Sequence, residues 1–156
     1  MNFNRFFRRR EFIVLLILLV LVVIIGFINP VFLQSESLQN VLDSSLILII
    51  VGIGEMFVLL TRGIDVSVGS IMGLSAVILG TALNAGVSLP VSILLAIITG
   101  LAAGAVNGIG VTVLRVPPII MTLGTLGIYR GLMPIITGGS WIETIPQSIK
   151  SLTNLT

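Results

Sequence analysis

Long apolar stretches, separated by short polar, glycine or proline breaks, dominate the pattern of this chain. The first stretch consists mostly of Leu, Ile and Val, and the Asn29-Pro30 pair ends it because proline disfavours a helical residue before it. A helix needs about 20 residues to cross the hydrocarbon core of a bilayer. The pattern predicts five membrane-spanning helices, at residues 12–28, 46–61, 66–83, 90–114 and 119–136.

Two amphipathic segments flank these spans. Residues 34–44 are polar with apolar residues at helical spacing, which predicts a short interfacial helix leading into the second span. Residues 140–156 have a similar pattern and begin near Trp141, a residue type enriched at membrane–water boundaries, so we expect an interfacial tail. The whole chain, residues 1–156, is then a single transmembrane domain. A cleaved signal peptide at residues 12–28 is the weaker interpretation, since no small-x-small site follows.

Composition gives the same fold class. Hydrophobic residues make up 56% of the chain and charged residues 9%, with a mean hydropathy of +1.21, whereas soluble domains carry about 25% charged residues. We therefore expect an all-α, polytopic membrane protein. Basic residues gather before the first apolar stretch, at Arg5, Arg8, Arg9 and Arg10. This placement predicts a cytoplasmic amino terminus rather than a nucleic-acid-binding surface, and it places Arg62 and Arg115 on the cytoplasmic side.

Several kinds of chemistry have no residues to support them. The chain has no Cys and no His, which removes thiol and imidazole groups for catalysis and for zinc binding. It contains no GxxxxGK[ST] phosphate loop, and its carboxylates are scattered singly. We predict no catalytic residues, no metal site, no cofactor and no enzymatic activity.

Ionisable residues within the apolar spans are candidate functional groups, because burying a charge in hydrocarbon is costly. Glu55 lies in the second predicted span and Arg130 in the fifth. Arg62 and Asp65 are three residues apart and would pair if the second helix continued through them. A boundary ion pair and a functional role both remain open for these two residues.

Small residues recur at helical spacing and predict close helix–helix packing in lipid. The packing candidates are Gly69 and Gly73 in the third span and Gly100, Gly104 and Gly108 in the fourth. Asn107 lies beside the second group. A hydrogen bond from its amide to a neighbouring helix is the favoured interpretation, and exposure to a polar pathway is the alternative.

Three motifs in the same order carry a family resemblance: TRGIDVSVGS (61–70), GLAAGAVNG (100–108) and PPIIMTLGTLGIYRG (117–131). Together they resemble the permease subunits of ABC importers for ribose, autoinducer-2 and related sugars. Within that family, the first motif and TGGSWIETIP (137–146) are most similar to the branch that imports autoinducer-2. The resemblance covers essentially the whole chain.

The resemblance implies a multi-pass protein of the bacterial inner membrane, in contact with lipid. Its implied partners are a second permease subunit, cytoplasmic ATPase subunits that bind ATP, and a periplasmic sugar- or autoinducer-2-binding protein. It also places Asp65, Asn107, Thr122 and Thr125 near the substrate pathway or its gating helices. The charged residues noted above, Arg62, Arg130 and Glu55, are further pathway candidates on the ground of their charge alone.

Permeases of this family are considerably longer, and their second half carries the loop that docks on the ATPase. The sequence therefore resembles an amino-terminal half, expected to be inactive in transport by itself. Two other functions stay open: a small membrane protein that modulates partner helices without transport, and an independent carrier or pore that uses Glu55 and Arg130.

Overall fold

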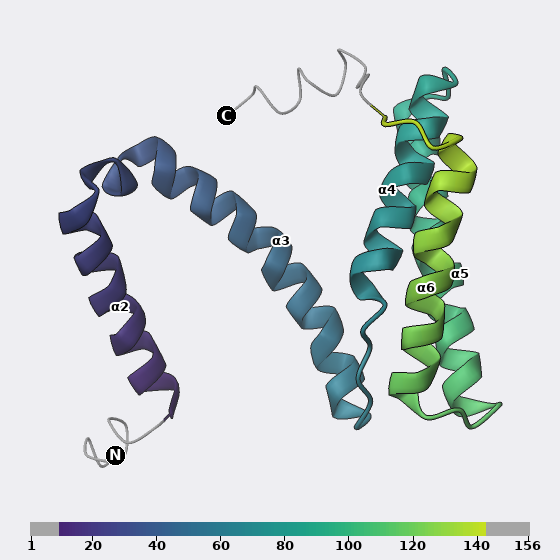
Figure 1. Cartoon of the computed structure of the whole chain (residues 1–156), viewed down its shortest axis with the longest axis horizontal. Coiled ribbons are helices and arrows are strands. Elements are labelled where there is room, and N and C mark those ends of the chain that lie inside the picture. Colours follow the sequence, from purple (N-terminus) through teal and green to yellow (C-terminus); the bar gives the residue numbers. More distant parts are fainter. Residues whose placement is uncertain (1–9, 143–156) are drawn as a thin grey trace. The chain divides into compact units, whose positions relative to one another are not determined.

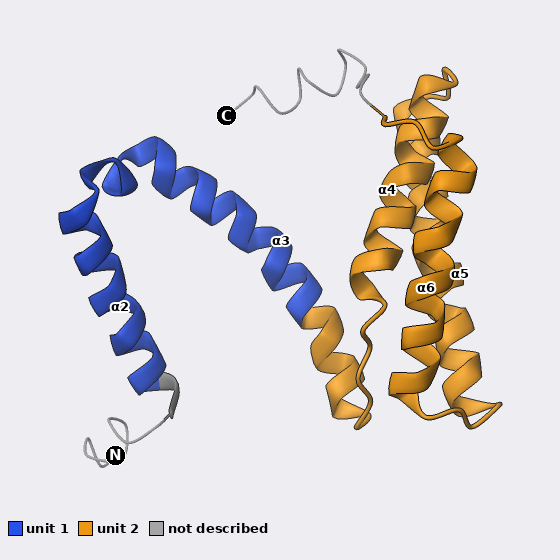
Figure 2. Cartoon of the chain, in the orientation of Figure 1, with its two compact units in different colours: residues 1–52 blue, residues 53–156 orange. Residues whose placement is uncertain are grey.

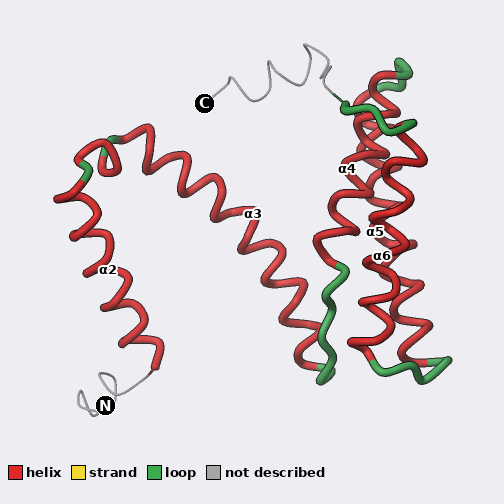
Figure 3. Tube along the Cα trace, in the orientation of Figure 1, coloured by secondary structure: helices red, strands yellow, loops and turns green. Residues whose placement is uncertain are grey.

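A computed structural model describes residues 10–142 of the chain (Figure 1). Within this range the secondary structure is helical, and Figure 3 shows helices joined only by loops and turns. The all-α prediction is confirmed. The elements are α2 (Arg10–Ile28), the 3-10 helix η1 (Pro30–Leu33), α3 (Ser35–Leu60), α4 (Val68–Asn84), α5 (Leu89–Thr112) and α6 (Pro118–Thr137).

One helix overlaps each of the five predicted spans, and some span ends lie up to two residues outside their helix. Three of these helices, α3, α5 and α6, are long and apolar enough to cross a membrane. The apolar part of α2 (Phe12–Ile28) and α4 (Val68–Asn84) are shorter apolar helices, and 17 residues cover about 25 Å of a hydrocarbon core about 30 Å thick. The orientation of the amino terminus stays a prediction. The predicted interfacial tail, residues 140–156, lies outside the described residues beyond Ile142.

The helix boundary predicted before the second span is wrong. Residues 34–44 do not form a separate interfacial helix, because α3 runs without interruption from Ser35 to Leu60. No Gly or Pro lies between Ser35 and Val51 to break it. The Ser45 hydroxyl donates to the Val41 carbonyl at 2.7 Å, within the helix. Polar residues at the start of α3 thus extend the apolar helix instead of forming one of their own.

The chain divides into two compact units, residues 1–52 and 53–156 (Figure 2). In the first unit, α2 leads through Asn29 into η1, where the Asn29 side chain accepts a hydrogen bond from the Val31 amide at 3.2 Å. Leu33 then packs against α2 at Gly26, which has no side chain to obstruct it. This contact positions the sharp turn between α2 and α3.

The second unit contains the end of α3 and a bundle of α4, α5 and α6. Its small core consists of Leu74 on α4, Ala103 on α5 and Tyr129 on α6, each 6% exposed. The Tyr129 hydroxyl donates to the Ala103 carbonyl at 2.9 Å, so α6 is hydrogen-bonded to the backbone of α5. Gly86, at φ 81°, provides the left-handed turn between α4 and α5 that other residues adopt at a cost.

Candidate functional site

A cluster of polar side chains links the loop before α4 to α5 and α6. We call it the polar cluster, and its members are Asp65, Ser67, Asn107, Thr122 and Thr125. All but Asp65 are buried, with exposed fractions of 0–5%. Buried polar groups in a membrane protein need hydrogen-bond partners, and among the described residues no buried side-chain polar atom lacks one.

Asp65 forms the start of the cluster. Its Oδ1 accepts hydrogen bonds from the Ser67 amide at 2.8 Å and from the Ser67 hydroxyl at 2.6 Å. A carboxylate that binds the amide two residues ahead forms an Asx turn, and α4 begins at the next residue, Val68. The negative charge also lies at the helix end that favours it. Asp65 therefore determines how the chain enters α4.

Asn107 lies at the centre of the cluster and links three segments. Its Nδ2 donates to the Ser67 hydroxyl at 2.7 Å and lies 3.5 Å from Oδ2 of Asp65. Its Oδ1 accepts a hydrogen bond from the Thr125 hydroxyl at 2.7 Å. One amide on α5 thus joins the loop before α4 to α6.

Thr122 connects the same loop to the first turns of α6. Its hydroxyl donates to the Ile64 carbonyl at 3.3 Å and accepts from the Val66 amide at 3.3 Å. This pair of bonds satisfies backbone groups that lie outside any helix, which is a requirement for irregular backbone at membrane depth.

Asp65 is the one cluster member that is not fully buried, and its side chain can accept a further hydrogen bond. It is half-buried, and its Oδ2 has only the long Asn107 contact, whereas Oδ1 accepts two short bonds. Oδ2 can therefore accept a further hydrogen bond, for example from a hydroxyl group. The hydroxyl and amide groups of the other members are bound by one another or by the backbone of the loop before α4.

The remaining charged candidates lie outside the cluster. Because α3 ends at Leu60 and Arg62 has a left-handed backbone (φ 61°), the helix does not continue to Asp65, and the condition for an Arg62–Asp65 pair is not met. Arg62 and Arg130 are exposed, and Glu55 is half-buried on α3. The structure does not bring these three residues together with the polar cluster through any hydrogen bond or ion pair among residues 10–142.

Only some of the glycines predicted to pack helices lie at a contact with another helix. A Cβ atom at Gly73 would lie 3.0 Å from the sulfur of Met133 on α6, and one at Gly100 would lie 3.4 Å from the Ser75 hydroxyl on α4. Positions 69, 104 and 108 have open space instead. The buried face of α5 runs through Ala103, Asn107 and Gly110.

Two contributors were missed at the sequence level. Ser67 is fully buried and binds both Asp65 and Asn107, and the Asp-x-Ser pattern directly before an apolar helix is a helix-start signal that could have identified it. Gly110 is buried against Met121, whose side chain occupies the space of a Cβ atom there. Only a known arrangement of α5 and α6 reveals that contact.

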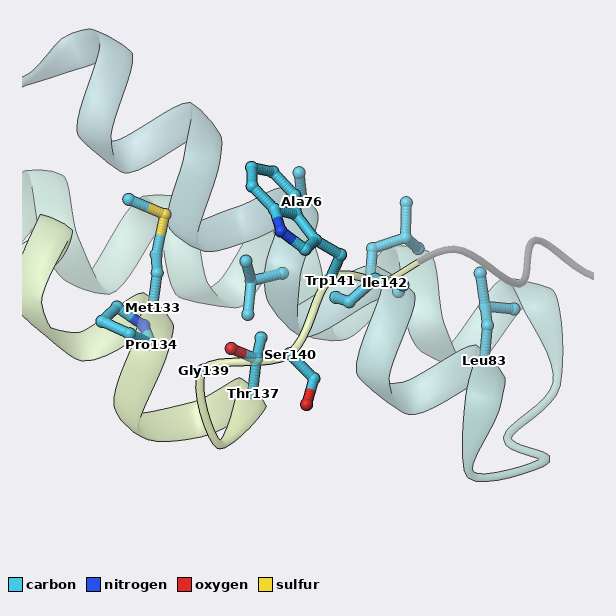
Figure 4. A pocket seen from close by; sticks show the side chains of 12 residues that line it. Ala76, Leu83, Met133, Pro134, Thr137, Gly139, Ser140, Trp141 and Ile142 are labelled. Atoms are coloured by element: carbon cyan, nitrogen blue, oxygen red, sulfur yellow. The ribbon is translucent and has the colours of Figure 1, made fainter.

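A cavity of about 620 Å³ lies at the opposite end of the same bundle (Figure 4). It is bounded by the second half of α4, the last turns of α6 and residues 139–142. Ile142 packs over Gly80, where a Cβ atom would lie 3.0 Å from Cγ2 of Ile142. Among residues 10–142, no charged side chain lines this cavity.

Comparison with known proteins places these features in a family. The family model described as "Branched-chain amino acid transport system / permease component" matches residues 37–156, which include the whole polar cluster. The chain belongs to this permease family. The resemblance to importer permeases is therefore confirmed, and this family's role is transport. With its long apolar helices, this permease chain is a multi-pass membrane protein.

Several curated relatives of this permease chain carry the name "Autoinducer 2 import system permease protein LsrC". The relative from Enterobacter sp. (strain 638) is 50% identical over 145 residues, which cover 93% of this chain and 42% of the relative. Those from Photorhabdus luminescens and Yersinia pestis (strain Pestoides F) are 49% and 51% identical over 143 residues, 92% of this chain and 43% and 41% of the relatives. The chain thus spans about two fifths of their length. No solved structure matches it.

Proposed function

We propose that this chain is a membrane-spanning component of a binding-protein-dependent ABC importer that moves autoinducer-2 or a ribose-like sugar across the bacterial inner membrane. In this proposal it works with a second permease subunit, cytoplasmic ATPase subunits that bind ATP, and a periplasmic binding protein. The chain itself supplies the pathway helices and no ATP site.

The observation that carries this proposal is the identity of about half of all aligned residues with permeases named for autoinducer-2 import. The aligned part includes the three motifs whose residues form the polar cluster. Asp65, Asn107, Thr122 and Thr125, which come from motifs far apart in the sequence, are hydrogen-bonded to one another or to the same loop.

Within this function we assign different roles to the cluster residues. Asn107, Thr122 and Thr125 hold α5 and α6 on the loop before α4, since their polar groups bind one another and the loop backbone. Asp65 has the remaining acceptor, Oδ2, and a hydroxyl-rich, uncharged ligand has donors to match it. Asp65 is thus the member we place closest to the substrate pathway.

Uptake by cells tests the proposal. The chain is expressed with a matching second permease, ATPase and binding protein in a strain without its own system, and depletion of autoinducer-2 from the medium is followed. A second arm also supplies, as a separate polypeptide, the part of a relative that this chain does not cover. We expect uptake that depends on the chain in the second arm.

Asp65→Ala is expected to lower that uptake at least tenfold at unchanged membrane level, because the loop loses its Asx turn and the pathway loses its open acceptor. Thr112→Val is the control, since this exposed hydroxyl bonds only to the Gly108 carbonyl of its own helix. Equal uptake with and without the chain in both arms would contradict the proposal.

Open glycine positions favour one second function, a protein that binds partner helices without transport. Cβ atoms at Gly104 and Gly108 on α5, and at Gly124, Gly127 and Gly131 on α6, would meet no atom within 4 Å. Faces of this kind allow another helix to approach closely. Stable co-purification with a membrane partner, combined with no uptake in either arm above, would support this second function over the first.

A further inference from the structure

Two arginines lie at the same end of the α4–α6 bundle. Arg62 comes two residues after the end of α3, and Arg115 comes three residues after the end of α5. The loop that contains Arg62 is hydrogen-bonded to Thr122 in the first turns of α6, and the loop that contains Arg115 leads directly into Pro118, where α6 begins. Figure 3 shows both loops at this end of the helices.

Both arginines have a left-handed backbone, with φ angles of 61° and 56°. Among the described residues they are the only non-glycine positions with a positive φ. Helices commonly end with glycine in this conformation because a Cβ atom makes it costly. The two positions therefore keep a long cationic side chain where glycine would relieve the backbone.

Neither guanidinium group has an acidic partner in the part of the chain that the structure describes. Both side chains are exposed, and no ion pair within residues 10–142 involves them. The nearby carboxylate, Asp65, is bound by Ser67 through Oδ1 and approached by Asn107 at Oδ2. Two positive charges are thus left at this end of the bundle.

We propose that Arg62 and Arg115 form a binding site for the phosphate of an anionic phospholipid headgroup. Both residues lie within three positions of the end of an apolar helix, and the end of a membrane-spanning helix is where we expect the headgroups to begin. The guanidinium group presents planar, paired donors that match phosphate oxygens. Attraction to an anionic leaflet falls off within a Debye length, so residues at the helix ends benefit from it most.

The full chain in lipid nanodiscs tests this site. Discs of phosphatidylcholine alone are compared with discs that also contain phosphatidylglycerol, by thermal unfolding and by native mass spectrometry of retained lipid. For the wild type we expect a higher unfolding midpoint with phosphatidylglycerol and preferential retention of that lipid. The same midpoint in both discs, with no preferential retention, would overturn the proposal.

The double variant Arg62→Gly/Arg115→Gly separates binding from folding. In phosphatidylcholine it should be at least as stable as the wild type, because glycine accepts the left-handed backbone. With phosphatidylglycerol it should lose the shift in midpoint and retain the anionic lipid about tenfold less. Arg130→Ala removes an equal charge from the interior of α6 and is the matched control, expected to keep the shift.

Two further outcomes would also overturn the site. One is an equal loss of lipid preference in Arg130→Ala, which would indicate a general charge effect. The other is an equal midpoint shift when millimolar inorganic phosphate is added to phosphatidylcholine discs, which would indicate a site for free phosphate rather than for a lipid headgroup.

Discussion

In the two units of this chain, the relation between hydrophobicity and burial is the reverse of that in a soluble protein. Helix α2 in the first unit is the more apolar region, yet its side chains are largely exposed, with Val14 at 64% and Leu19 at 54%. In the second unit the most buried side chains are polar: Ser67 and Ser92 are fully buried, and Thr125 is 3% exposed.

The lipid that surrounds a membrane protein explains this difference. In a bilayer, apolar side chains gain nothing by leaving lipid for protein, so hydrophobicity inserts a helix but does not pack it. Small residues and hydrogen bonds between helices supply the association instead. Polar residues therefore mark the packed region of the second unit, whereas the most hydrophobic helix, α2, keeps nearly all its described side chains exposed.

The largest effect should come from removing the centre of the polar cluster. Asn107→Leu keeps the number and branching of the side-chain heavy atoms but leaves the groups of Ser67, Asp65 and Thr125 without their shared partner. At about 1–3 kcal/mol for each buried group left unsatisfied, reduced by partners available in the membrane, we expect a loss of about 2–4 kcal/mol. The measurement is the free energy of unfolding in bicelles by steric trapping.

A decrease in the free energy of unfolding below about 0.5 kcal/mol for Asn107→Leu is typical of surface substitutions. Such a result would show that the polar cluster does not hold the helices together. Thr112→Val on the same helix is the reference, because its hydroxyl bonds only within α5.

An intermediate effect is expected at the contact of α5 with α6. Gly110→Ala places a methyl group where the Met121 side chain lies, and overpacking of this kind costs about 1–3 kcal/mol. Gly108→Ala, two residues away in open space, should not destabilise the fold. The same unfolding assay measures both variants.

Adding Met121→Ala to Gly110→Ala should restore part of the lost stability, because it removes the atoms that the new methyl group meets. Equal unfolding free energies for Gly110→Ala and Gly108→Ala would show that close packing at this crossing contributes nothing.

The smallest effect should come from the most hydrophobic helix. Leu19→Ala on α2 is expected to change the free energy of unfolding by no more than about 0.5 kcal/mol, since this side chain stays in lipid in both states. The same substitution at Leu74, which is 6% exposed on α4, leaves a cavity and should cost about 2 kcal/mol or more. Similar costs at the two positions would contradict the comparison between the units.

The helices were predictable because each apolar stretch has its own local end signal. Proline and glycine breaks predicted the ends of α2, α4, α5 and α6 to within about two residues. The start of α3 was not predictable in this way. Polar residues from Ser35 onward suggested a separate helix, but no breaker separates them from the apolar stretch, so the helix continues.

The site was predictable only as a set of residue types. Asp65, Asn107, Thr122 and Thr125 could be chosen because polar groups in apolar segments need a reason to be there. The connection of Asp65 to Asn107 through Ser67 depends on a contact between residues 40 positions apart. The predicted glycine face of α5 shows the same limit, since Asn107 and Gly110 face the bundle while Gly104 and Gly108 meet open space.

The sequence by itself determined that this protein is a membrane protein of several helices and a relative of importer permeases, because hydropathy and motifs are local properties of the chain. Only the tertiary structure decided which polar groups satisfy one another, which face of α5 packs, and where Arg62 and Arg115 lie relative to α6. Those facts depend on how the helices cross, and in lipid the crossing is selected by side-chain fit and hydrogen bonds between distant residues.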